Sequence, residues 1–101
     1  MLIQHTLISG TATADGAATA LPVGRNVTVM LQAYLDGAGV SATCTVEARM
    51  NGGPWNEVTS FALAGASDHA EYILDNEPWY ELRGRITAIG VTTTATVVMG
   101  S

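Results

Sequence analysis

One short segment of the chain brings together residue types that bind metals: Asp68, His69 and Glu71. If a strand begins early in this segment, His69 and Glu71 share one of its faces and Asp68 lies opposite. A zinc site normally takes three or four nitrogen or sulfur ligands from rigid positions, and this cluster offers one imidazole. We therefore interpret the segment as a polar loop, and the sequence predicts no metal site.

Carboxylates also occur in pairs that a glycosidase could use as acid and base. The candidates are Glu71, Asp75, Glu77 and Glu81. Nine acidic residues in a chain of 101 will produce such pairs in any case, and so short a chain implies no substrate-sized cleft. The sequence has neither a serine–histidine–aspartate order with an elbow motif nor a phosphate-cradling glycine loop before a helix. It predicts no catalytic residue, no cofactor and no enzyme activity.

The remaining candidate binding residues are aromatic and basic. Trp55, Trp79 and Tyr80 could form a platform on which sugars stack, as in small β-sandwich binding modules. The alternative, which we favour, is that one tryptophan fills the core and the other covers an end of the sandwich. Arg83 and Arg85 lie two positions apart on one strand face, so we expect cross-strand ion pairs. They could instead anchor an acidic partner surface.

Composition excludes several classes of function. The chain carries four arginines, no lysine and nine acidic residues, which gives a net charge of −5. A nucleic-acid binder normally needs a basic patch, which this chain could build only from Arg83 and Arg85, so we expect no nucleic-acid partner. No segment approaches the roughly 20 apolar residues of a membrane span, and the N-terminal run lacks the features of a signal peptide. We therefore expect no membrane partner, and folding in the cytoplasm.

The centre of the chain has the pattern of a β-hairpin. Residues 40–50 alternate strictly, with apolar side chains at the even positions and polar ones at the odd positions, as a half-buried strand requires. Asn51-Gly52-Gly53 then supplies residues that tolerate positive φ, as hairpin turns demand, and the return strand runs from Trp55 to Leu63. Cys44, the single cysteine, lies on the apolar face, so we expect a buried, inert thiol.

Similar patterns on both sides of this hairpin predict the fold class. Residues 26–36 form a second alternating strand, expected to pair with residues 40–50 and so to complete a three-stranded meander. About seven strands at spacings of roughly 8–12 residues are typical of a sandwich. The sequence therefore predicts one all-β domain over residues 1–101, an antiparallel β-sandwich of about seven to eight strands. Jelly-roll and immunoglobulin-like strand orders are both open.

The first 21 residues do not show the pattern of a strand with one buried face and one exposed face. Apolar residues fall on both sides of the first strand, which suits a strand that is covered on both sides or that pairs with a neighbouring subunit. The chain also lacks lysine, a residue that commonly blocks edge-to-edge pairing of strands. We therefore predict a homo-oligomer in which residues 1–21 form an arm that contacts neighbouring subunits. The candidate interaction surface comprises Leu2, Ile3, His5, Leu7, Trp55, Trp79, Arg83 and Arg85.

Three stretches carry a recognisable overall pattern: SGTATADGAATALPVGRNVTVMLQAYL at residues 9–35, VEARMNGGPWNEVTSFAL at 46–63 and PWYELRGRITAIGVTTTATVVMG at 78–100. They combine a strand, a glycine turn, a tryptophan and a second strand, followed by an aromatic-led strand that carries arginine. In this pattern the chain resembles the small β-sandwich structural proteins encoded in the virion-assembly regions of tailed bacteriophages. The turn at 51–54, Asn-Gly-Gly-Pro, departs from their commoner Asp-Gly form.

The resemblance implies a protein that does no chemistry. Its leading implication is a capsid decoration (cement) protein: a knob, often a trimer, that clamps subunits of the major capsid protein. Internal DNA pressure must then break these contacts before the shell opens. A neck, tail, baseplate or fibre component is the alternative within this class, and a small carbohydrate-binding sandwich module is the alternative outside it. The location implied is the virion, assembled in the host cytoplasm.

Overall fold

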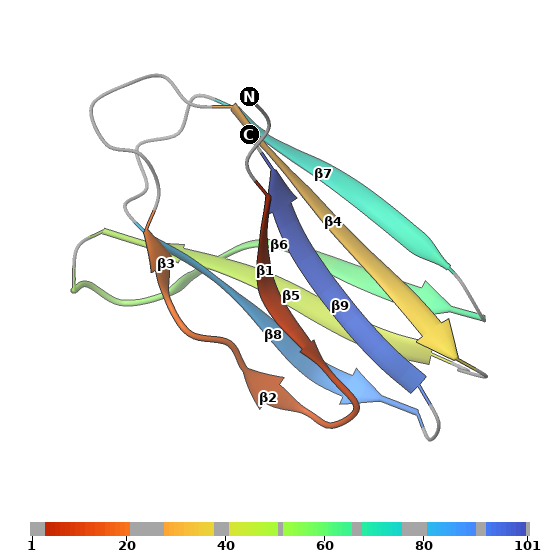
Figure 1. Ribbon diagram of the computed structural model, residues 1–101. Coiled ribbons are helices and arrows are strands. Elements are labelled where there is room, and N and C mark those ends of the chain that lie inside the picture. The colour runs from red at the N-terminus through yellow and green to blue at the C-terminus, as the bar shows by residue number, and fades with distance from the viewer. Residues whose placement is uncertain are drawn as a thin grey trace.

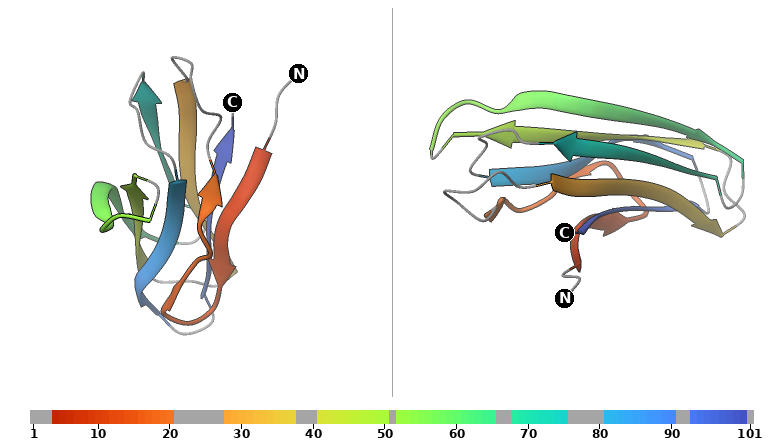
Figure 2. Two further views of the ribbon diagram at one scale, coloured as in Figure 1. Left: turned by 90° about the vertical axis from the view of Figure 1, so that its left-hand side faces the viewer. Right: turned by 90° about the horizontal axis from the view of Figure 1, so that it is seen from above.

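The computed structural model describes residues 4–20, 28–37, 41–50, 52–65, 68–75, 81–90 and 93–100. Within these ranges the chain forms nine strands in two antiparallel sheets that pack face to face (Figure 1, Figure 2), which confirms the predicted all-β sandwich. The described part has no helix of the length and apolarity that crossing a membrane would need. The strands are β1 (Gln4–Gly10), β2 (Ala14–Asp15), β3 (Thr19–Ala20), β4 (Thr28–Gly37), β5 (Ser41–Arg49), β6 (Asn56–Ala64), β7 (His69–Asp75), β8 (Glu81–Ile89) and β9 (Thr93–Gly100).

The strand order is that of a jelly roll. The front sheet, which lies nearer the viewer in Figure 1, has the order β1-β9-β4-β7. The back sheet has the order β2-β8-β5-β6, with β3 also paired to β8. The first strand therefore pairs with the last, β2 and β3 with β8, β4 with β7, and β5 with β6. This nesting of antiparallel pairs around one innermost hairpin characterises the jelly roll and excludes the immunoglobulin-like order.

The central hairpin forms as predicted, but the three-stranded meander does not. β5 and β6 are antiparallel neighbours, with Ser41 opposite Ala64 and Ala48 opposite Asn56. β4, however, pairs with β7 and β9, so it lies in the front sheet while β5 lies in the back sheet. The prediction that these two strands pair is therefore wrong. Alternation with a period of two defines the two faces of a strand, but it does not say which sheet the strand joins.

Inward-facing residues of both sheets form one apolar core. Cys44 is fully buried within it, and this burial raises the pKa of its thiol to about 11. The thiolate, which is the reactive form, is therefore scarce near neutral pH. Met50, which the alternation placed on the apolar face, is 50% exposed because β5 ends at Arg49. The largest fully buried apolar side chains are Val29, Leu31, Val46, Leu74, Leu82, Ile86 and Val97.

A β-bulge explains why the first strand carries apolar residues on both faces. Thr6 is opposite Val98 and Ile8 is opposite Val97, so Leu7 is an extra residue in β1. The bulge turns two consecutive side chains, Leu7 and Ile8, into the core, as bulges characteristically re-aim side chains. Residues 4–20 accordingly belong to the sandwich itself, since β1 pairs in the front sheet and β2 and β3 pair in the back sheet.

Two glycines let this N-terminal segment close one side of the sandwich. The Gly16 N–H donates a hydrogen bond of 2.7 Å to the Gly84 carbonyl. A Cβ at Gly84 would lie 2.8 Å from Cγ2 of Ile8 and 3.1 Å from Cβ of Leu7. A Cβ at Gly16 would collide with the carbonyl oxygen of Leu7. Close packing of the bulge against β8 therefore requires glycine at both positions.

We expect Gly16→Ala to lower the free energy of unfolding by about 2–3 kcal/mol, because the new methyl group must displace backbone atoms in a packed region. Gly53→Ala is the matched control: the nearest atom to a Cβ there is the Met50 carbonyl oxygen at 3.7 Å, so the change should stay within about 0.5 kcal/mol. Urea denaturation followed by circular dichroism measures both. Equal stabilities would show that the bulge does not depend on this contact.

Candidate functional site

The outer face of the back sheet carries a network of cross-strand ion pairs. Nε of Arg49 donates to Oε1 of Glu81 at 2.9 Å, and Nε of Arg83 donates to Oε1 of Glu47 at 2.7 Å. The pairing of β5 with β8 places the two partners of each ion pair directly opposite one another. Side chains of opposite charge stabilise a sheet from such positions. The prediction of cross-strand pairs is confirmed for Arg83, which pairs with Glu47 on β5, and for Arg85, which pairs with Asp15 on β2.

Arg85 connects this network to the N-terminal segment. Its Nε donates to Oδ1 of Asp15 at 2.6 Å, and its Nη1 lies 3.5 Å from Oε2 of Glu47. The hydrogen bond to Arg85 lowers the pKa of the Asp15 carboxyl, and the same bond raises the pKa of Arg85. β2, only two residues long, is therefore held to β8 by a charged contact as well as by backbone pairing.

The indole of Trp55 lies over two arginines of the same network. The Cζ atom of Arg49 is 4.2 Å from the ring centroid and that of Arg83 is 4.5 Å from it, which is the geometry of a cation–π contact. Trp55 is half-buried on the outer face and does not fill the core. Its ring shields the guanidinium groups from water on one side, while Glu47 and Glu81 neutralise them on the other.

The polar segment at the start of β7 forms a local turn. The backbone N–H groups of Ala64 and His69 each donate to the Asp68 carboxylate at 2.9 Å. Nδ1 of His69 lies 2.9 Å from Oε2 of Glu71, and this contact raises the pKa of the imidazole. In the described residues, no three histidine, cysteine or acidic side chains converge closely enough to hold a metal ion.

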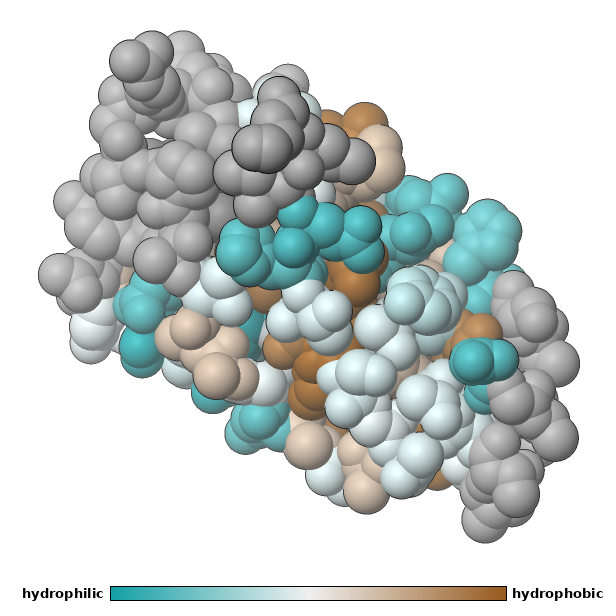
Figure 3. Space-filling model, in the orientation of Figure 1, coloured by the Kyte–Doolittle hydropathy of each residue, from teal (hydrophilic) through white to brown (hydrophobic). Residues whose placement is uncertain are grey.

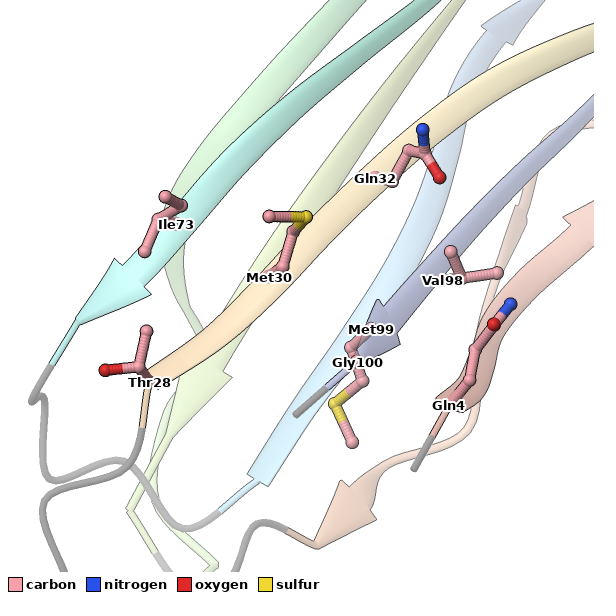
Figure 4. A pocket seen from close by; sticks show the side chains of 8 residues that line it. All are labelled: Gln4, Thr28, Met30, Gln32, Ile73, Val98, Met99 and Gly100. Atoms are coloured by element: carbon pink, nitrogen blue, oxygen red, sulfur yellow. The ribbon is translucent and has the colours of Figure 1, made fainter. Parts of the chain in front are cut away.

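The outer face of the front sheet has the opposite character. Its outward positions on β1, β9 and β4 are uncharged apart from Asp36 near the end of β4, and its charged pair, His69 and Glu71, lies on β7 at the edge. Pale and brown atoms, of intermediate and apolar residues, fill much of the middle of this face in Figure 3. A groove of about 390 Å³ opens at one end of this face, where β1 and β4 begin and β9 ends. Figure 4 shows the side chains that line it: Gln4, Thr28, Met30, Gln32, Ile73, Val98, Met99 and Gly100.

The structure does not gather the predicted interaction residues at one place. Trp55, Arg83 and Arg85 share the outer face of the back sheet, whereas His5 is exposed on β1 in the front sheet. Leu7 is a core residue of its own chain, because the bulge turns it inward. Leu2, Ile3 and Trp79 lie outside the described residues.

Sequence reasoning missed the exposed apolar residues beside the groove. Met30 is 50% exposed and Ile73 is 56% exposed. Each occupies an outward position of its strand, where most neighbours are polar. Met30, for example, follows Thr28 and precedes Gln32 on the polar side of β4. A large apolar residue on the polar side of an alternating strand was the signal available in the sequence.

No protein-family model matches the sequence, and no curated protein matches it. Among solved structures, the chain is similar to the SPBc2 prophage-derived protein YomS, with a TM-score of 0.62 and 12% identity over 100% of this chain and 94% of that one. It is also similar to the PBSX exported protein XepA, with a TM-score of 0.63 and 10% identity over 97% of this chain. The match spans 36% of XepA.

A third similar structure is Family 16 Carbohydrate Binding Module-2, with a TM-score of 0.51 and 10% identity over 89% of this chain and 69% of that one. At such identities, likeness between structures establishes a shared fold and says nothing of shared residues. The jelly-roll sandwich of this chain is thus also the fold of a prophage-derived protein and of a carbohydrate-binding module.

We expect Glu47→Gln to lower the free energy of unfolding by about 1–2 kcal/mol, because it leaves half-buried guanidinium groups without their countercharge. The Glu47 side chain is 13% exposed and contacts both Arg83 and Arg85. Glu71→Gln is the control, because this carboxylate is 43% exposed and pairs with His69 at the surface. The free energy of unfolding should fall by about 0.5 kcal/mol or less in that variant. Thermal and urea unfolding at neutral pH compare the two. Equal losses would mean that burial does not strengthen the back-face network.

Proposed function

We propose that this chain is a non-enzymatic structural protein of a tailed-phage virion. The observation that carries the proposal is the likeness of fold to the prophage-derived protein YomS over essentially the full length of both chains. It agrees with the resemblance of three sequence stretches to small virion proteins of tailed phages. The arginines of the back face add support, because their charges are already neutralised by neighbouring carboxylates and are not held ready for a substrate.

Within this class we propose a capsid decoration protein whose partner is the major capsid protein. A sandwich with broad, largely neutral faces can bury surface across the boundary between capsid subunits, and each buried contact must break before the shell opens. Leu2, Ile3 and Trp79 are candidates for this contact on the strength of their sequence positions. Attachment at the neck, tail or baseplate is the alternative and would use the same kinds of surface.

Electron microscopy of particles from the encoding phage, with and without this gene, tests the proposal. We expect density on the outside of the capsid that disappears in the deletion, and heads that release their DNA at a lower temperature. Restoring the gene in trans is the control for both effects. Density on the neck, tail or baseplate would replace the decoration role by the alternative. Deletion particles that match the wild type everywhere would contradict a virion role.

A carbohydrate-binding module is the second candidate, favoured by the fold shared with Family 16 Carbohydrate Binding Module-2. Trp55 is the one tryptophan in the described residues and the natural platform for a sugar ring. We expect no glycan binding through it, because the guanidinium groups of Arg49 and Arg83 lie over its ring. A glycan array compares the wild type with Trp55→Ala, and Met50→Ala is the surface control. Binding by the wild type that only Trp55→Ala abolishes would favour the second candidate.

A further inference from the structure

The contact between the N-terminal segment and β8 places an aspartate directly before a glycine. A Cβ at Gly16 would collide with the carbonyl oxygens of Leu7 and Gly84, so only glycine fits at this position. The preceding residue is Asp15, whose carboxylate is the partner of Arg85 on the neighbouring strand. The packing of this side of the sandwich thus uses an Asp-Gly sequence.

An Asp-Gly sequence is chemically labile in an unfolded chain. The backbone nitrogen of the glycine gives up its proton and attacks Cγ of the aspartate. A hydroxyl of the carboxyl group leaves as water, and a five-membered succinimide ring forms. A water molecule then opens the ring. Attack of this water at Cγ restores aspartate, whereas attack at the backbone carbonyl carbon gives isoaspartate, in which the main chain runs through the former side chain. Glycine favours the reaction because it has no Cβ to hinder ring closure.

Both reacting groups of Asp15-Gly16 are engaged in the folded chain. The Gly16 N–H donates to the Gly84 carbonyl at 2.7 Å, so its nitrogen must give up a hydrogen bond before it can attack. Oδ1 of Asp15 accepts from Nε of Arg85 at 2.6 Å. This bond lowers the pKa of the carboxyl, so the neutral acid, from which water leaves most readily, is scarce near neutral pH.

These contacts protect the sequence without burying it. The Asp15 side chain is 53% exposed, and β2 contains only two residues. A short, exposed pairing of this kind opens locally more often than the central strands of a sheet. The contacts with β8, and not exclusion of water, therefore hold the reaction back.

We propose that Asp15-Gly16 is a site of isoaspartate formation that its contacts with β8, chiefly the ion pair with Arg85, keep unreactive in the folded protein. Isoaspartate adds one carbon to the main chain. Residue 15 then cannot stay opposite Arg85 while Gly16 stays bonded to Gly84. The modification therefore detaches β2 and leaves that part of the edge of β8 unpaired. The inference is independent of the virion role.

Peptide mapping of the stored protein tests the inference. The chain has no lysine, so trypsin cuts only after arginine, and residues 1–25 form a peptide in which Asp15 is the one acidic residue. The peptides of residues 26–49 and 50–83 carry Asp36-Gly37 and Asn51-Gly52, which can close the same ring and serve as internal references. The full chain is kept at neutral pH and body temperature for several weeks. Mass spectrometry with electron-transfer fragmentation then measures isoaspartate in each peptide.

We expect isoaspartate to form at position 15 more slowly in the folded wild type than in the same chain unfolded in urea. In the folded chain, Arg85→Gln should speed the reaction at least about twofold, because loss of an exposed ion pair shifts a local opening equilibrium by about this factor. Glu71→Gln is the matched control, since it removes another exposed ion pair on the opposite sheet. Asp15 should react in this control at the wild-type rate.

Circular dichroism checks the fold of each variant. If Arg85→Gln unfolds, Arg85→Lys takes its place, with a smaller increase expected because the positive charge is kept. Three results would overturn the inference: a folded wild type that reacts as fast as the chain in urea, a folded Arg85 variant that reacts no faster than the wild type, or equal acceleration by Glu71→Gln. None of them bears on where the protein lies in a virion.

Discussion

The fold depends on nested pairing between strands that are far apart in the chain. β1 pairs with β9, and β2 and β3 pair with β8, so the N-terminal segment has no place until the C-terminal strands are formed. Among the strands that the structure describes, only β5 and β6 are consecutive in the chain and paired with each other. The loop-closure entropy of the outer pairs must be offset by burial between the two sheets. We therefore expect folding to begin at the central hairpin. The packing of Leu7 and Ile8 against Gly84 depends on the outer pairs and forms last.

The two outer faces of the sandwich differ in the side chains that they carry. On the back sheet, opposite charges on β5 and β8 meet across the strands, and Trp55 covers two of the arginines. These charges stabilise the sheet and are neutralised within the chain. On the front sheet, threonine, glutamine and methionine face outward around the groove. The two faces therefore differ in how their polar groups are satisfied: charges pair across the strands on the back face, whereas uncharged side chains line the groove on the front face.

The proposed role in assembly agrees with the way the charged side chains are held. Arg83 and Arg85 are held by Glu47 and Asp15 on the surface of a sheet, and a catalytic site would instead direct such groups into a cleft. The same two-layer fold serves a prophage-derived protein and a carbohydrate-binding module, so the fold alone does not select a function. The proposed structural role rests on the likeness to the prophage-derived protein YomS, and the neutralised charges of the back face agree with it.

Local sequence patterns were sufficient to predict the strands and their buried faces. Strict alternation in residues 40–50 and 26–36 predicted two strands with their buried sides, and the glycines after Asn51 predicted the hairpin turn, because these signals depend only on neighbouring residues. Long-range pairing, which local patterns do not reveal, places β4 and β5 in different sheets and turns Leu7 inward. It also decided that Gly100 stands beside Met30. Each of these features depends on which distant strand is the partner and in which register. The sequence shows that alternation breaks at Leu7 and Ile8, but the pairing with β9 is needed to show that a bulge turns both side chains inward.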